Sequence, residues 1–321
     1  MDIVFCINTS YAKYVAVSLC SIFENNLKEK IHIHILTDGL LPNDEKLLTD
    51  IIERYGGKYS KHLVDDSRLK ELKSTWSVYS WYRCYIPEFL PNTSRCLYLD
   101  ADVIVTGNIQ ELFTLRMNQK AIAAVIDTES YNPQVFKRLQ YPQQKKYICS
   151  GIMIMNLDYW REHNITEQIL NYANLNHNRI AFPDQDSINV VCQDTKIILP
   201  LKFGILNTFV TNNEFIKDNI SSLKEMLSDP RIIHYAGFAP WVIEKNRHFM
   251  RNDFKYYNHL AGNPAKSKHI LSGMKLVNFK MKRILTKIGL LNFKPYFCTP
   301  ILSYNDIQSK LESFDNKNNI I

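Results

Sequence analysis

The sequence predicts an α/β protein in which a mostly parallel sheet is covered by helices. Apolar segments at 2–7 and 31–36 have the length and composition of strands. Each is followed by a segment with apolar residues at helical spacing, 11–24 and 42–55, and polar turns such as Asp38-Gly39 separate them. Strands that alternate with helices in this order are typical of parallel sheets. Each helix carries the chain back to the end of the sheet where the previous strand began, so the next strand runs in the same direction.

The rest of the chain continues this alternation until about residue 250. Further strands are expected at 96–105, 121–127, 147–157, 197–199 and 232–234, and helices at 74–89, 159–176 and 181–191. We therefore divide the chain into a body, residues 1–250, and a helical C-terminal segment, residues 251–321.

The composition fits a globular protein with a sizeable core, since 45% of the 321 residues are hydrophobic and 22% are charged. Seven scattered cysteines without a C-x-x-C pair favour reduced thiols over a disulfide framework or a zinc site. No apolar run approaches the roughly 20 residues that span a bilayer, and Asp2 argues against a signal peptide. We expect a cytoplasmic protein that reaches a membrane only from that side.

The basic charge is concentrated near the C-terminal end. Residues 244–300 hold twelve Lys and Arg against two acids, a net charge of +10 in a chain of net charge +7. Apolar residues recur there at intervals of four and three, which predicts an amphipathic helix with the stripe Ile270, Met274, Val277, Met281, Ile284, Ile288 and Leu291. Such a helix can lie on an anionic membrane surface; the alternative is a helix packed on the body with a solvated basic face. The apolar stripe favours lipid over nucleic acid.

Asp100 and Asp102 interrupt an apolar segment that runs from Cys96 to Gly107. A buried strand does not carry two carboxylates unless they are paired or bind a cation. Because the two residues are two apart, both side chains point to the same side of an extended segment. Paired carboxylates at the end of an apolar strand suit a divalent metal that also holds phosphate oxygens. The alternative is a strand followed by a polar turn.

Three other stretches are expected near these carboxylates, because open α/β sheets bind ligands at the carboxyl ends of their strands. Residues 8–11 offer small polar groups and an aromatic ring for a nucleobase and ribose. Asp184 and Gln185 open a helix, where Asp184 could also be merely a cap. His234 could complete a metal shell, and Gly237 could let the backbone approach a phosphate. An ordinary turn or a structural histidine is the alternative when each stretch is taken singly.

The ordered set of motifs resembles glycosyltransferase family 8, especially the bacterial galactosyl- and glucosyltransferases of lipopolysaccharide and lipooligosaccharide synthesis. The motifs are YLDADVIV, SGIMIMNLDYW, PDQDSIN and HYAGFAPW, and the resemblance covers about three quarters of the chain. It implies a GT-A fold, which is a single Rossmann-like mixed sheet flanked by helices.

The resemblance also implies a UDP-sugar donor and Mn²⁺, with Mg²⁺ as the alternative metal. The implied metal ligands are Asp100, Asp102 and His234. The implied nucleotide and donor contacts are Asn8, Ser10, Tyr11, Arg83, Asp100, Ala101, Asp102 and Gly237. The implied sugar-binding and catalytic residues are Asp127, Asp184 and Gln185.

Family members retain the anomeric configuration, with the residue equivalent to Gln185 nearest the anomeric carbon. A neutral amide is a poor nucleophile, so we favour same-face attack, with Gln185 steadying an oxocarbenium-like centre. Two departures from the family pattern stand out. HYAGFAPW is one residue shorter than the common HxGxxKPW and lacks its lysine, for which Lys245 is a candidate replacement. Cys149 stands where the family commonly has Asn.

The sequence thus predicts a retaining transferase that moves galactose or glucose from a UDP-sugar to a lipid-linked or cell-surface glycan in bacterial lipopolysaccharide or polysaccharide synthesis. Its expected location is the inner face of the plasma membrane. The alternative is a catalytically weak or silent glycan- or membrane-binding protein on the same fold. A nucleotidyltransferase is disfavoured because the turn Asn8-Thr9-Ser10 has neither Gly nor Lys.

Overall fold

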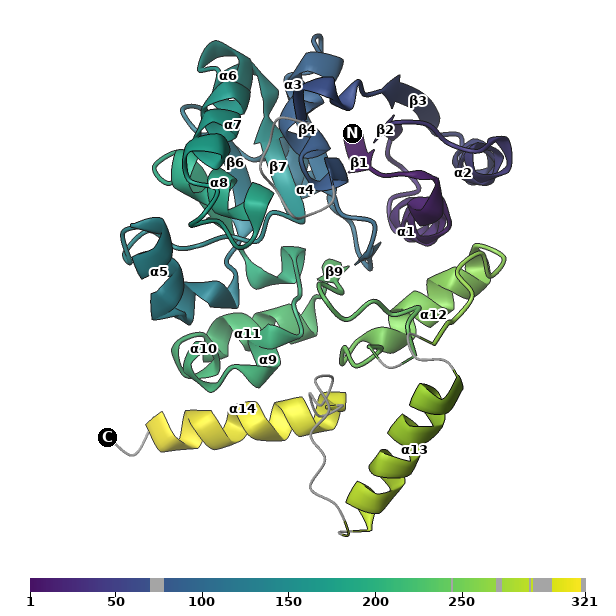
Figure 1. Ribbon diagram of the computed structural model, residues 1–321, viewed down its shortest axis with the longest axis vertical. Helices are drawn as coiled ribbons and strands as arrows, with labels where there is room; N and C mark the ends of the chain where they lie inside the picture. Colours follow the sequence, from purple (N-terminus) through teal and green to yellow (C-terminus); the bar gives the residue numbers. More distant parts are fainter. Residues whose placement is uncertain (70–77, 244, 270–272, 289, 291–301, 319–321) are drawn as a thin grey trace.

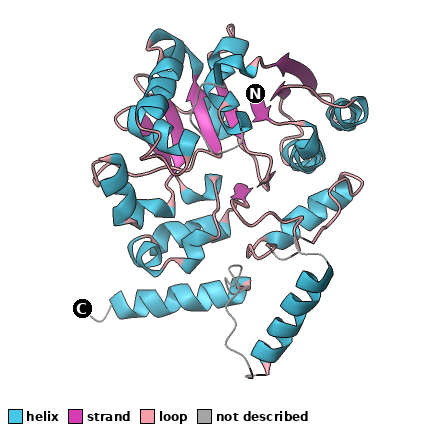
Figure 2. Ribbon diagram, viewed as in Figure 1, coloured by secondary structure: helices cyan, strands magenta, loops and turns pink. Residues whose placement is uncertain are grey.

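A computed structural model describes residues 1–69, 78–243, 245–269, 273–288, 290 and 302–318. It confirms an α/β architecture with one seven-stranded sheet, a two-stranded sheet and covering helices (Figures 1 and 2). Ile270 and Leu291 of the predicted apolar stripe lie outside the described residues, as do residues 74–77 of the predicted helix 74–89. Within the described part of the chain, no helix is long and apolar enough to cross a membrane.

The first part of the sheet is parallel, as predicted. It consists of β1 (Asp2–Cys6), β2 (His32–Thr37) and β3 (Lys58–Leu63), with α1 (Ala12–Glu24) and α2 (Pro42–Arg54) as connections. Strand β3 was not predicted, because its sequence KYSKHL has no apolar face. It can be polar because it is the edge strand of the sheet and pairs with β2 alone.

The second part of the sheet is mixed. The strand order is β3-β2-β1-β4-β7-β6-β8, with β4 (Arg95–Leu99), β7 (Ile152–Asn156), β6 (Ile122–Val125) and β8 (Lys196–Leu199). Strand β7 runs antiparallel to both neighbours, while β4 pairs parallel with β1 and β8 parallel with β6. Residues 147–151, predicted as part of a strand, form the loop that enters β7.

The apolar segment around Asp100 forms two strands. After β4 the chain turns, and β5 (Val103–Val105) pairs antiparallel with β9 (Ile232–His234) in a separate two-stranded sheet. The register places Val103 opposite His234. This pairing brings two stretches that lie more than a hundred residues apart in the sequence to the same point of the fold.

The remaining helices of the body are short. They are α3 (Ile86–Phe89), α4 (Gln110–Thr114), α5 (Pro133–Leu139), α6 (Leu157–Glu162), α7 (Ile165–Leu175), α8 (Pro183–Val191), α9 (Thr208–Thr211), α10 (Asn213–Asp218) and α11 (Ile220–Ser228). The single helix predicted over 159–176 is divided at Asn164, whose φ of 51° is left-handed. In the segment predicted as a helix at 74–89, the described residues form 3₁₀ turns followed by α3.

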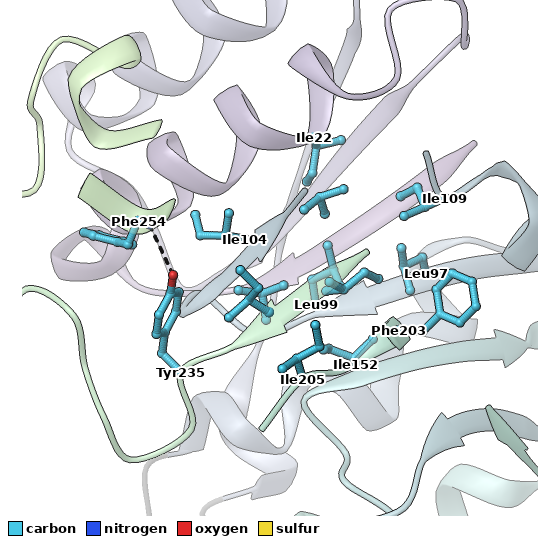
Figure 3. Packing of buried hydrophobic residues seen from close by; sticks show 14 of the residues in the cluster. Ile22, Leu97, Leu99, Ile104, Ile109, Ile152, Phe203, Ile205, Tyr235 and Phe254 are labelled. Atoms are coloured by element: carbon cyan, nitrogen blue, oxygen red, sulfur yellow. Dashed lines mark hydrogen bonds between the residues drawn. The ribbon is translucent and has the colours of Figure 1, made fainter. Parts of the chain in front are cut away.

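The core lies on both faces of the sheet. Leu97 and Leu99 of β4 point into the cluster under α1 and α2, whereas the alternate residues Cys96 and Tyr98 face α3, α6, α7 and α8. Figure 3 shows Leu97 and Leu99 packed with residues of β5 and β7. Burying one such side chain contributes roughly 1.5–3 kcal/mol, so this two-sided core holds the strand ends in fixed positions.

The described residues of the C-terminal segment form three helices, α12 (Arg251–Leu260), α13 (Gly273–Lys287) and α14 (Tyr304–Asn318). Helix α12 packs on α1 through the buried Phe254 and Tyr257, and the Phe254 N–H donates to the buried Tyr235 hydroxyl (Figure 3). Helix α14 buries Ile307 and Leu311. In contrast, α13 stands away from the body (Figure 1). The division of the chain at residue 250 remains a prediction.

Candidate active site

A cavity of about 640 Å³ opens at the carboxyl ends of β1 and β4. Of the residues predicted for the site, Asn8, Tyr11, Arg83, Asp100, Ala101, Asp102, Asp127, Asp184, Gln185, His234 and Gly237 line it. Ser10 does not line it. Strand ends are where a parallel sheet gathers residues from distant parts of the sequence, which explains the convergence.

Asp100, Asp102 and His234 form a group that can hold a metal ion. One ligand atom from each lies within 4.8 Å of the others. His234 Nε2 is 3.2 Å from Asp102 Oδ1 and 3.6 Å from Asp100 Oδ2. The two carboxylates flank the turn between β4 and β5, and the pairing of β9 with β5 brings the imidazole to them. Two hard oxygen donors and one imidazole nitrogen fit a divalent cation such as Mn²⁺.

Gly151 leaves the space in which this group is assembled. A Cβ at this position would lie 2.2 Å from His234 Cε1 and 2.6 Å from Asp100 Oδ2. Any other residue here would push the imidazole and the carboxylate apart. The close approach explains the glycine inside an otherwise apolar stretch.

The electrostatic surroundings of His234 favour its protonated form in the absence of a metal. Burial alone would lower the pKa of His234, but the carboxylate of Asp102 and the thiol of Cys149 raise it well above its ordinary value. The Cys149 Sγ lies 3.5 Å from His234 Nδ1, on the side of the ring away from the carboxylates. A metal must displace this proton to bind, so metal binding and protonation compete.

Arg83 is buried and connects Asp100 of the metal-binding group with Asp184. Its Nη2 is 3.0 Å from Asp100 Oδ1, and its Nη1 is 3.2 Å from Asp184 Oδ2. Burial would raise the pKa of Asp100, but Arg83 and His234 outweigh burial and hold it below its ordinary value. Asp100 is therefore ionised at neutral pH, as a metal ligand must be.

A hydrogen-bond network orients Gln185, which also lines the cavity. The Gln185 side chain accepts a bond from the Ser150 N–H at 2.9 Å and donates one to Asp127 Oδ2 at 3.2 Å. The Ser150 hydroxyl donates to Asp184 Oδ2 at 3.1 Å. Burial raises the pKa of both Asp127 and Asp184. The amide oxygen and nitrogen of Gln185 are thereby fixed in one orientation.

The turn after β1 places Asn8 and Tyr11 at the cavity and keeps Ser10 behind it. The Asn8 side chain accepts bonds from the Ser10 N–H at 3.0 Å and the Ser10 hydroxyl at 2.6 Å. Ser10 therefore shapes the turn instead of lining the cavity. The Tyr11 ring packs edge-on against Tyr14, which in turn stacks on Trp241 at 3.6 Å between ring centroids.

The sequence model described as "Glycosyl transferase family 8" matches residues 2–244. The chain belongs to glycosyltransferase family 8. This confirms the resemblance drawn from the four motifs.

Among the relatives of this chain are transferases of lipopolysaccharide synthesis. The chain is 30% identical over 243 residues to a lipopolysaccharide 1,2-glucosyltransferase of Escherichia coli, over 73% of this chain and 71% of the relative. It is 26% identical over 249 residues to a lipopolysaccharide 1,3-galactosyltransferase of Salmonella typhimurium, over 75% and 72% of the two chains. The galactosyltransferase LgtC, solved with donor and acceptor sugar analogues, superposes with a TM-score of 0.70 at 19% identity, over 87% and 99%. This structural likeness confirms the GT-A fold.

Several residues that line the cavity of this family 8 chain were not predicted. Ser150 opens the motif SGIMIMNLDYW, but nothing in its local sequence signals the bonds to Asp184 and Gln185. Other unpredicted lining residues include Phe238, inside the motif HYAGFAPW, and six residues outside the four motifs: Tyr79, Thr128, Glu129, Phe182, Asn207 and Thr208. Lys245, considered as a replacement for the missing lysine, also lines the cavity.

Proposed function

We propose that this family 8 chain transfers galactose or glucose from a UDP-sugar to a lipid-linked or cell-surface glycan in bacterial lipopolysaccharide or polysaccharide synthesis. The observation that carries the proposal is one cavity that is lined by both the metal-binding group and the oriented Gln185. The similarity to a lipopolysaccharide glucosyltransferase and a lipopolysaccharide galactosyltransferase supports the choice of hexose and acceptor.

Asp100, Asp102 and His234 would hold Mn²⁺, or Mg²⁺ as the alternative. When bound, the metal supplies positive charge that stabilises the UDP leaving group. Asn8 and Tyr11 offer the uridine a polar group and an aromatic ring. The lysine of the common family motif is absent, and Lys245 at the cavity wall offers a cation for the diphosphate in its place.

Retention of the anomeric configuration is the reaction course that the Gln185 network supports. The neutral amide is held by Ser150 and Asp127 and is a poor nucleophile. Its oxygen carries a partial negative charge suited to an anomeric carbon that becomes positive in the transition state. Asp127 and Asp184 can accept hydrogen bonds from sugar hydroxyls. We therefore favour attack by the acceptor on the face of the donor sugar from which UDP departs.

The exposed face of α13 supports a peripheral position on the inner face of the plasma membrane. Met274, Val277, Met281, Ile284 and Ile288 are each more than half exposed. Lysines alternate with them along the same helix, so the segment combines apolar contact with attraction to anionic lipid.

The proposed function is tested with the purified full chain and a panel of UDP-hexoses. We expect product formation on the host's own lipid-linked glycan with UDP-galactose or UDP-glucose, and slow hydrolysis of the same donor without acceptor. If no UDP-hexose is turned over under either condition, the alternative of a silent glycan- or membrane-binding protein replaces this proposal.

A further inference from the structure

A second group of metal-binding side chains lies on the sheet away from the cavity. Asp2 begins β1 and pairs in register with His32 of β2, and His34 follows two residues later on the same face. One ligand atom of each lies within 4.8 Å of the others. None of the three lines the active-site cavity. Asp2 and His32 are the first residues of β1 and β2, and Asp2 lies about 13 Å along β1 from its carboxyl end.

The spacing of these atoms suits a tetrahedral ion. Asp2 Oδ1 lies 3.0 Å from His34 Nε2 and 3.5 Å from His32 Nδ1. Ligand atoms around a tetrahedral zinc ion, with bonds of about 2.0–2.1 Å, are roughly 3.3 Å apart. The two observed distances lie on either side of this value, and the active-site group shows similar spacings of 3.2 Å and 3.6 Å.

The second nitrogen of each imidazole has a hydrogen-bond partner of its own. His34 Nδ1 lies 3.1 Å from His62 Nε2, and His32 Nε2 lies 2.8 Å from Ser60 Oγ. Both partners are on β3. Metal-binding histidines characteristically bond their outer nitrogen in this way, which fixes the ring and its tautomer. When the outer nitrogens carry the protons, His34 Nε2 and His32 Nδ1 point their lone pairs at the Asp2 carboxylate. A cation bound between the two nitrogens and the carboxylate relieves the repulsion between these electron-rich atoms.

We propose that Asp2, His32 and His34 bind a divalent transition metal of the zinc class, with solvent as the fourth ligand. Two imidazole nitrogens and one carboxylate favour such an ion over Mg²⁺ or Ca²⁺, which prefer all-oxygen sites. The side chains of Asp2 and His32 are 33% and 31% exposed, so an ion can enter from solvent. The ligands join β1 to β2, and the outer partners extend the site to β3. A bound metal therefore stabilises the association of β1, β2 and the edge strand β3.

Zinc binding by the purified full chain tests this proposal. Equilibrium dialysis against Zn²⁺ should give one more bound equivalent for the wild type than for H32Q, while D102N should lose a different equivalent. His32 is chosen because His34 is buried and its replacement endangers folding. H177Q, which changes a surface histidine far along the sequence, is the matched control and should bind as the wild type does. Turnover of UDP-hexose should be unchanged in H32Q.

A second variant separates loss of a ligand from loss of structure. D2N keeps the size of the side chain and should weaken Zn²⁺ binding at least tenfold, while H62Q, which removes an outer partner, should weaken it roughly tenfold. Cobalt substitution gives an independent signal, since the intense visible bands of tetrahedral Co²⁺ should appear in the wild type and D102N and be lost in H32Q, which keeps only the signal of the active-site ion. Equal zinc stoichiometry and affinity in wild type, H32Q and D2N would overturn the proposal and leave a hydrogen-bonded histidine cluster.

Discussion

At the scale of single residues, the site depends on a small number of close contacts around His234. Asp102, Asp100 and Cys149 surround its ring, and Gly151 leaves the room that the ring occupies. One added methyl group beside the His234 ring is therefore enough to disturb the metal-binding group.

The variant G151A should reduce kcat/KM for UDP-hexose about a hundredfold, because its Cβ displaces the imidazole of His234 and misplacement by about 1 Å has this effect. Mn²⁺ affinity measured by calorimetry should fall in parallel, with an unchanged circular dichroism spectrum. The matched control is G107A, whose Cβ would meet only the flexible side chain of Arg231. Equal activity in G151A and G107A would show that the close approach has no catalytic importance.

Metal binding should release protons at neutral pH. The pKa of His234 is raised well above its ordinary value in the metal-free protein, so the ring is protonated there and must lose its proton to become a ligand. Mn²⁺ affinity should therefore increase as the pH rises towards the raised pKa. Calorimetry in two buffers of different ionisation enthalpy measures the release, and we expect close to one proton per metal. Absence of proton release would mean that His234 is neutral before the metal binds.

At the scale of elements, the three C-terminal helices differ in what they cover. Helices α12 and α14 bury apolar residues against the body, whereas α13 exposes its apolar stripe beside lysines. The five members of the predicted stripe that the structure describes, Met274, Val277, Met281, Ile284 and Ile288, thus face solvent instead of the core. An exposed apolar stripe of this kind indicates an interaction surface.

The variant M281D/I284D should bind anionic vesicles of phosphatidylglycerol and phosphatidylethanolamine at least about tenfold more weakly than the wild type. Both replaced side chains are exposed, at 53% and 59%, so the fold should persist. S309D/S313D on α14 adds the same charge at exposed positions and should bind nearly as the wild type does. Co-sedimentation measures both. Unchanged binding of M281D/I284D would contradict the membrane proposal.

At the scale of the whole molecule, the sequence predicted the order of β1, α1, β2 and α2 because their apolar periods are clear. It missed β3, since an edge strand can be polar, and it missed the break at Asn164.

Asp100 and Asp102 were predicted because carboxylates in an apolar segment need a partner. Ser150 could not be predicted, because its role arises only when β7 and α8 meet. The second sheet, which joins His234 to the two carboxylates, follows from pairing between distant segments and has no local signal.

His248 should make the free energy of unfolding of the protein depend on pH. Burial lowers the pKa of this fully buried imidazole from 6.5 to about 3, and its Nδ1 accepts a hydrogen bond from the Met250 N–H. Below pH 6.5 the unfolded chain therefore binds a proton that the folded chain does not. As the pH is lowered from 6.5 towards 3, this residue should decrease the free energy of unfolding by about 1.4 kcal/mol per pH unit. Urea unfolding at several pH values should show a shallower loss in H248Q; equal slopes would contradict this assignment.

The central claim is that Asp100, Asp102 and His234 hold the metal on which UDP-hexose turnover depends. The most direct test measures turnover by the full chain with Mn²⁺, after removal of metal by EDTA, and in D102N. We predict loss of activity in EDTA, recovery on addition of Mn²⁺, and a fall in kcat/KM of about a hundredfold or more in D102N. D50N, at an exposed ion pair with Lys46, is the control and should be fully active. Turnover that persists in EDTA or in D102N would contradict the claim.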